Sequence, residues 1–116
     1  MTNISIFLIA FVALLHIYFL ILEMFLWTTP KGLKTFGLKK EFAEESKVLA
    51  ANQGLYNGFL AAGLIWSIIT PNISIAIFFL ICVSIAGGYG AYSTKKIRLF
   101  FIQSVPAIIG LITLFL

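Results

Sequence analysis

The sequence has little charge, almost no cysteine and none of the short motifs that mark common soluble enzymes. Only 10% of its 116 residues are charged, and one, Cys82, is a cysteine, whereas soluble domains carry about 25% charged residues. A single cysteine excludes an intrachain disulfide, and without C-x-x-C or other metal-ligand spacings no metal site is expected. No nucleotide-binding loop or nucleophile elbow indicates a named reaction, so whether the protein is an enzyme stays open. The composition excludes a soluble globular domain.

Long apolar runs occupy most of the chain. There are four such runs, at residues 4–27, 48–69, 73–92 and 97–116. All four reach the roughly 20 residues needed to cross a bilayer. The runs are continuously apolar rather than alternating, which favours helices over a β-barrel. The first run lacks the basic start and the cleavage site of a secretory signal, so we expect it to be retained. We predict an all-α integral membrane protein, a four-transmembrane-helix bundle.

We expect one membrane domain over residues 1–116. Its helices are predicted at about 4–27, 40–69, 73–92 and 97–116, with a cytoplasmic loop at 28–39. The second helix is expected to begin near Lys39 or Lys40, ahead of its apolar run. Gly37 provides a break there, and acidic residues such as Glu41 favour the first turn of a helix. The amphiphilic loop before it is expected to lie on the membrane surface.

Basic residues fall in only two of the predicted connections. These residues are Lys31, Lys34, Lys39, Lys40, Lys47, Lys95, Lys96 and Arg98. Because Lys and Arg in short loops mark the cytoplasmic side, both termini are predicted outside (N-out, C-out). We therefore expect a multi-pass protein of the bacterial cytoplasmic membrane. The net charge of +4 reflects this topology, so no nucleic-acid partner is expected, and the basic rim would attract anionic lipid headgroups.

Two ionisable side chains lie inside the first run. His16 and Glu23 are seven residues apart, which places them two turns apart on the same helical face. An ionisable group at the centre of a membrane helix costs about 2.5 to 3.5 kcal/mol to insert and is a functional-site hypothesis by default. Glu23 and His16 are therefore candidate catalytic acids or bases. The alternative is structural: a carboxylate held by another helix, and an interior histidine with its hydrogen bonds satisfied.

Polar side chains of the other predicted helices gather in the same cytoplasmic half. Gln53 and Asn57 share one helical face, and Asn52 and Tyr56 share the adjoining one. Asn52 and Gln53 are expected at about the same depth as Glu23, so their amide side chains can donate to its carboxylate. We predict an inner-leaflet pocket with basic residues at its rim, and its ligand-binding residues are Glu23, Asn52, Gln53, Tyr56, Asn57, Tyr89, Tyr92, Arg98 and Gln103. The alternative is that these groups only hold helices together, at about 0.6 kcal/mol per hydrogen bond.

Small residues predict close helix packing. Gly54 and Gly58 form a G-x-x-x-G, and Gly87 and Ala91 form a second small-residue pair. Their partner helix can belong to the same chain or to a neighbour, and we expect a homo-oligomer. Pro106 predicts a kink in the last helix.

Four stretches carry a resemblance to a known family. Residues 16–19, 22–27, 36–38 and 46–58 resemble a family of small bacterial four-helix integral membrane proteins of unknown function. The resemblance covers nearly the whole chain. It implies the fold and the membrane location, and adds no known activity. It places the residues that mark the family on Glu23, Asn52, Gln53, Tyr56 and Asn57.

A second similarity is to the MAPEG superfamily, the membrane-associated proteins of eicosanoid and glutathione metabolism. These are four-helix chains that assemble as trimers. Residues 46–57 are similar to their second-helix pattern E-R-x-x-x-A-[HN]-x-N-x-x-[ED], and the resemblance implies glutathione as a cofactor. Ser46, Lys47, Gly54 and Asn57 replace the pattern's Glu, Arg, Asn and terminal acid. These departures remove charged side chains that would bind the tripeptide glutathione, so the cofactor stays unknown.

Three functions fit these observations. The first is binding or modification of a lipid-like amphiphile, either a membrane lipid or an amphiphilic small molecule. The second is a proton-coupled small multidrug exporter in which Glu23 alternates between a proton and a cationic substrate, although the outer half offers no polar path. The third is a structural or assembly subunit whose polar residues fix the helix register.

Overall fold

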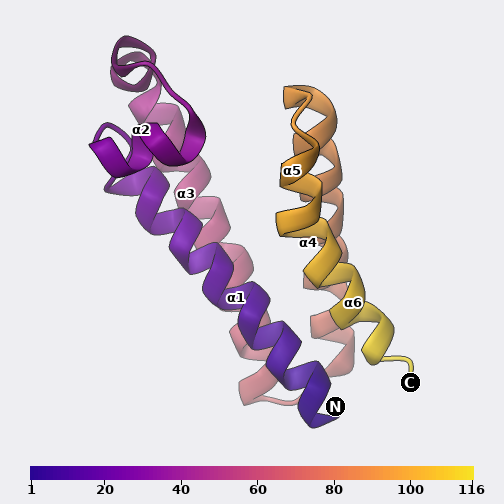
Figure 1. The fold of residues 1–116 in the computed structure, drawn as a ribbon. Helices are drawn as coiled ribbons and strands as arrows, with labels where there is room; N and C mark the ends of the chain where they lie inside the picture. The colour runs from indigo at the N-terminus through magenta and orange to yellow at the C-terminus, as the bar shows by residue number, and fades with distance from the viewer. The chain divides into compact units, whose positions relative to one another are not determined.

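The structure, a computed structural model, describes residues 1–116 as helices joined by short turns (Figure 1). Its elements are α1 (Asn3–Met24), α2 (Pro30–Phe36), α3 (Lys40–Ile69), α4 (Ile73–Thr94), α5 (Ile97–Leu99), the π-helix η1 (Phe100–Ser104) and α6 (Val105–Thr113). No strand is present, so the predicted all-α class is confirmed.

The chain divides into two compact units. One comprises Leu15–Phe59 and is named the α2 unit; the other comprises Met1–Leu14 with Leu60–Leu116 and is named the α4 unit. Both boundaries fall inside long helices, so α1 and α3 each contribute to both units.

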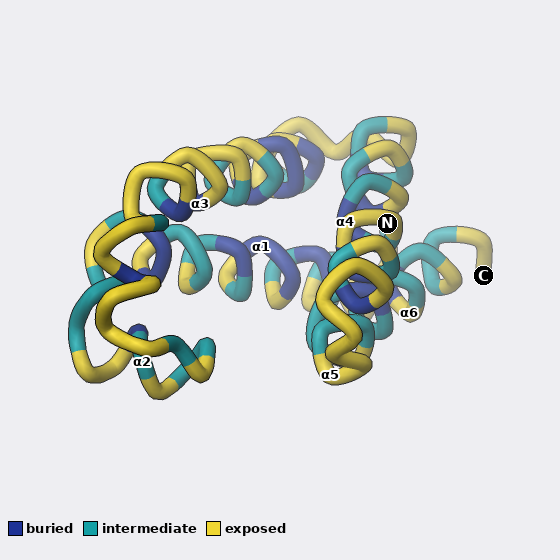
Figure 2. Tube along the Cα trace, turned by 90° about the horizontal axis from the view of Figure 1, so that it is seen from above, coloured by how far each residue is buried: buried dark blue, intermediate teal, exposed yellow.

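The α4 unit has an apolar core to which its long helices and α6 all contribute. The fully packed positions are Ile9, Val12, Ala13, Leu64, Ala76, Leu80, Val83 and Ala107. Figure 2 shows such positions as dark blue segments of the tube. Several are alanine or valine, so the helices approach closely. At the edge of this core, the Ser5 hydroxyl of α1 donates to the Thr113 hydroxyl oxygen over 2.9 Å.

A π turn interrupts the last expected helix, at residues 97–116. Pro106 has no N–H, and its ring would clash with the carbonyl of Ile102 in a regular α-helix. The chain widens just ahead of the proline, where the N–H of Val105 bonds to the carbonyl of Phe100, five residues back. The kink expected from Pro106 is thus a π turn.

Glycine at position 87 allows η1 to lie directly against α4. The Ser104 hydroxyl donates to the carbonyl of Ser84 over 2.8 Å. A Cβ atom on Gly87 would lie 2.9 Å from the backbone nitrogen of Ser104, too close for any real contact. Gly87, one residue of the predicted small-residue pair, therefore packs against η1 of the same chain.

A short helix occupies part of the expected cytoplasmic loop, 28–39, and this corrects the prediction. Thr29 caps α2 by accepting from the N–H of Gly32, and Pro30 takes the first helical position. Gly37 ends the helix in the left-handed conformation, with φ of 64°. The preceding helix, expected to reach residue 27, ends at Met24.

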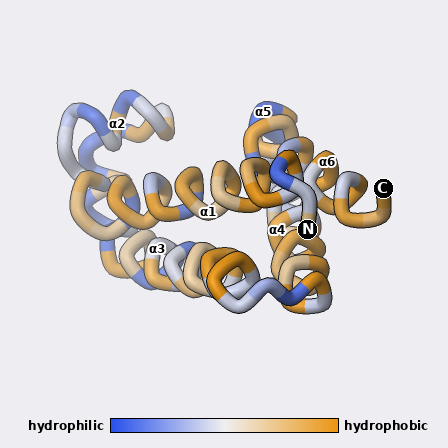
Figure 3. Tube along the Cα trace, turned by 90° about the horizontal axis from the view of Figure 1, so that it is seen from below, coloured by the Kyte–Doolittle hydropathy of each residue, from blue (hydrophilic) through white to orange (hydrophobic).

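Two helices are long and apolar enough to cross a membrane by length and composition, α1 and α4. Within the most apolar 18 residues of each helix, only 28% of the α1 stretch and 22% of the α4 stretch are buried inside the structure. Many of their apolar side chains are therefore exposed or only partly buried, and α1 is coloured chiefly as hydrophobic in Figure 3. The amides of α3 interrupt its apolar run, and the last apolar helix, Ile97–Thr113, is shorter.

Alanine substitutions at two adjacent glycines test the packing of η1 on α4. Each substitution raises helix propensity by the same amount, up to about 1 kcal/mol. The new Cβ of Gly87→Ala would clash with Ser104, whereas a Cβ on Gly88 meets nothing within 4 Å. Gly87→Ala should lower the free energy of unfolding by about 1 to 3 kcal/mol, and Gly88→Ala should not. Chemical unfolding followed by circular dichroism measures both; equal stability would contradict the packing.

Candidate functional site: a buried carboxylate held by two amides

Glu23 lies in the last turn of α1, within the α2 unit, and is only 3% exposed. The Gln53 side-chain amide donates to its Oε2 over 2.6 Å. The Asn57 amide donates to its Oε1 over 2.5 Å. Each carboxylate oxygen therefore has a side-chain donor from α3, and these three residues are named the Glu23 cluster.

The spacing of residues along α3 explains how the cluster forms. Gln53 and Asn57 are four residues apart, so their side chains leave the same face of the helix. Gly54 lies beside them, and a Cβ there would be 3.1 Å from the Cβ of Glu23 and 3.2 Å from the carbonyl oxygen of Leu20. The G-x-x-x-G therefore packs against α1 of the same chain, which resolves the choice that the sequence left open.

The cluster can still accept hydrogen bonds. A carboxylate oxygen has two lone-pair directions, and each oxygen of Glu23 receives one side-chain donor. Gln53 is an exposed residue, so one member of the cluster reaches the surface of the chain. No positive side chain pairs with Glu23. The one ion pair in the structure joins Lys47 to Glu44 at the surface. The arrangement suits a polar group that donates hydrogen bonds.

The other predicted residues of the α2 unit lie outside the cluster. Asn52 and Tyr56 are exposed, and Asn52 is not a donor to Glu23, although both were expected in one pocket. The Tyr56 ring lies 6.0 Å from that of Phe59. His16 is 1% exposed, and its ring meets Phe19 edge-on at 5.3 Å.

One contact in this unit was not anticipated from the sequence. The indole N–H of Trp27 donates to the Ser46 hydroxyl over 3.1 Å, and its ring lies 4.9 Å from that of Phe36. Trp27 thereby links the segment after α1 to both α2 and α3. The signal was available in principle, because a buried indole N–H usually has a hydrogen-bond acceptor.

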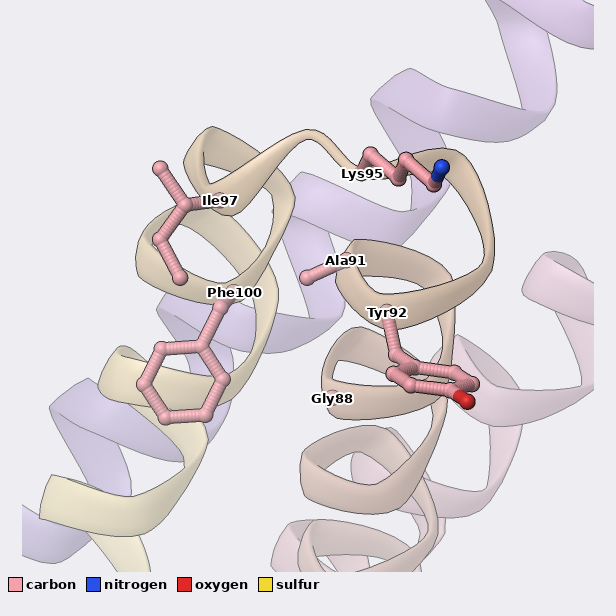
Figure 4. Close-up of a pocket in the computed structure, with 6 residues that line it drawn as sticks. All are labelled: Gly88, Ala91, Tyr92, Lys95, Ile97 and Phe100. Carbon is pink, nitrogen blue, oxygen red and sulfur yellow. The ribbon is translucent and has the colours of Figure 1, made fainter.

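The remaining predicted residues belong to the α4 unit. Tyr89, Tyr92 and Arg98 are exposed, and Gln103 is half-buried near Gly87. Of these, Tyr92 lines a pocket. That pocket is open and shallow, with a volume of about 520 Å³, and its lining is Gly88, Ala91, Tyr92, Lys95, Ile97 and Phe100 (Figure 4).

Comparison with known proteins places the chain in a family. Residues 10–115 match the family described as "Protein of unknown function (DUF1304)". The chain belongs to the DUF1304 family. It is also 34% identical over 119 residues to "Uncharacterized protein YpaA" of Lactococcus lactis subsp. lactis (strain IL1403), with 99% of each chain covered. No solved structure matches the chain.

These matches confirm the resemblance to a family of unknown function. They include all residues of the Glu23 cluster, because the family match begins before Glu23 and ends after Asn57. They do not show a relation to the MAPEG superfamily.

A double-mutant cycle tests the bond between Asn57 and Glu23. Asn57→Ala should lower the free energy of unfolding by about 1.5 to 3 kcal/mol, because it leaves one buried carboxylate oxygen without its donor. In a Glu23→Leu background the same change should cost at least about 1 kcal/mol less. Asn52→Ala, an exposed amide on the same helix, should change stability by under about 0.5 kcal/mol. Additive effects at Glu23 and Asn57 would contradict the bond.

Proposed function

We propose that this DUF1304 protein is a multi-pass protein of the bacterial cytoplasmic membrane, with four transmembrane helices and both termini outside. The exposed apolar surfaces of α1 and α4 support this placement, since water would be an unfavourable solvent for them. The restriction of all basic residues to two stretches, 31–47 and 95–98, supports the orientation.

We further propose that it binds a lipid-like amphiphile, and that the polar end of this ligand meets the Glu23 cluster. The observation that carries the proposal is the Glu23 carboxylate itself, 3% exposed on an apolar helix and bonded only by neutral amides. Burying a carboxylate without a positive partner is costly. A ligand with an amine or hydroxyl end would supply a further donor to a carboxylate oxygen, and an amine would also supply the absent positive charge.

Binding is favoured over acid–base catalysis by the position of His16. Seven residues of helix separate it from Glu23, a rise of about 10.5 Å along the axis. That distance is too great for both groups to act on one bond of a small polar head, because a general acid or base must lie within hydrogen-bond reach. The absence of a positive partner in the cluster also argues against glutathione, which carries two carboxylates.

A structural role is the second candidate, and one observation favours it. Both oxygens of Glu23 already receive a donor from α3, so the cluster can fix the register of α1 against α3 without any ligand. Such a role predicts loss of folding when Glu23 changes, rather than loss of a bound molecule. The exporter hypothesis has no comparable support, because it needs a polar path on the other side of the membrane.

Native mass spectrometry of protein released from a mild detergent tests the binding proposal. The wild type should retain an amphiphile, and Glu23→Gln should retain at least tenfold less of it. Tenfold corresponds to about 1.4 kcal/mol, the scale of one hydrogen bond to a charged group. The variant keeps the shape of the side chain, and the Gln53 or Asn57 amide can turn over to accept from its new N–H, so helicity and oligomeric state should be unchanged.

Glu45→Gln is the matched control, because Glu45 is exposed and makes no ion pair. It should retain the amphiphile as the wild type does. A wild type without ligand, together with a Glu23→Gln variant that unfolds or dissociates, would refute binding and leave the structural role.

A further inference from the structure

Charge is divided unequally between the two units. The acidic residues of the chain are Glu23, Glu41, Glu44 and Glu45, and all of them belong to the α2 unit. The α4 unit has no acidic side chain, but it has three basic ones within four positions, Lys95, Lys96 and Arg98. All three are exposed, and none forms an ion pair. This unit therefore presents a concentrated positive charge without a partner of its own.

The open pocket of the α4 unit lies directly at this basic cluster. One wall is the last turns of α4, with Gly88, Ala91 and Tyr92, and the facing wall is Ile97 and Phe100 (Figure 4). Lys95 lies at the end of the pocket where α4 turns into α5. Most of the lining is thus apolar, with one ammonium group at its end.

Two backbone features keep the pocket open. A Cβ atom on Gly88 would meet nothing within 4 Å, so the space above this glycine is unoccupied by the chain. Lys95 has a φ of 59°, the one non-glycine residue with a positive φ. This left-handed residue ends α4 and sends the chain back along it within two residues.

We propose that this pocket is a binding site for an anionic phospholipid. The phosphate would lie among Lys95, Lys96 and Arg98, and the first part of an acyl chain would lie along Gly88, Ala91 and Phe100. Tyr92, with an apolar ring and a polar tip, is suited to the boundary between headgroup and chain. The site shares no residue with the Glu23 cluster and rests on the proposed function only for the placement of α4 in a membrane.

The chemistry of the pocket favours a lipid over a free phosphate. A free anion gains nothing from an apolar wall, whereas an acyl chain buries its surface there. Basic residues at the cytoplasmic end of a membrane helix also lie where the anionic headgroups of the inner leaflet are found. Each such residue is expected to contribute about fivefold to affinity.

Titration of the detergent-solubilised protein with phosphatidylglycerol and, separately, phosphatidylcholine tests the site by native mass spectrometry. The wild type should bind phosphatidylglycerol at least tenfold more tightly. The triple variant Lys95→Gln, Lys96→Gln, Arg98→Gln should lose this preference. The matched control Lys34→Gln, Lys39→Gln, Lys40→Gln removes the same charge from the α2 unit and should keep it. Equal loss in both triple variants would show only a general charge effect and would overturn the site.

Two further variants identify the occupant and separate the two proposals. Gly88→Leu places an apolar side chain in the pocket from a position where a Cβ meets nothing within 4 Å, and it should weaken phosphatidylglycerol binding about tenfold while the protein stays folded. Unchanged binding in Gly88→Leu, with displacement of the lipid by millimolar inorganic phosphate, would show a phosphate site and overturn the lipid proposal. Glu23→Gln should leave phosphatidylglycerol binding intact even if the amphiphile of the Glu23 cluster is lost. Loss in Glu23→Gln as well would contradict a separate site.

Discussion

Two amides of α3 donate to the carboxylate of Glu23 in α1, and the geometry of the α2 unit follows from these bonds. A carboxylate that is 3% exposed is tolerable only when its oxygens are bonded, since an unpaired buried charge costs several kcal/mol. The amides reach it because Gly54 lets the two helices approach to near backbone contact. The steric requirement for glycine and the polar requirement for amides therefore coincide at one level of α3. A change in either would disturb both.

Much of the helical architecture could be predicted from hydropathy alone. The start of α4 at Ile73 follows from an apolar run and its flanking break, whereas the start of α3 at Lys40 follows from Gly37 and the acidic first turn. The helix α2 was missed because hydropathy does not report capping, although Thr29, Pro30 and Gly37 are its ordinary signals. The π turn could not be located in advance, because it depends on the contact of Ser104 with α4 as well as on Pro106.

The site was predictable to the extent that helical periodicity decides it. Gln53 and Asn57 follow from i, i+4 spacing, but Asn52 is turned about 100° from Gln53, and the sequence alone does not say which amide faces α1. The glycines resolve this, since Gly54 must face the partner helix. The pocket in the α4 unit was invisible for a different reason. Apart from Tyr92 and Lys95, its walls are made of residues without functional groups, and only their arrangement leaves a space.

The π turn of η1 also bears on how this chain tolerates insertions and deletions. A π turn holds one residue more than an α turn, so it absorbs a residue without rotating the helix beyond it. If residues 100–104 formed a regular α-helix, Ala107 and Gly110, both buried, would turn by about 100° away from the core. Removing one residue from this segment would keep the same face inward, but in the resulting regular helix the Pro106 ring would clash with the carbonyl four residues back, so the proline would have to change with it. The extra residue of η1 and the proline that follows it are therefore a linked pair: losing both would leave the buried face of α6 in place, whereas losing either one alone would disturb it.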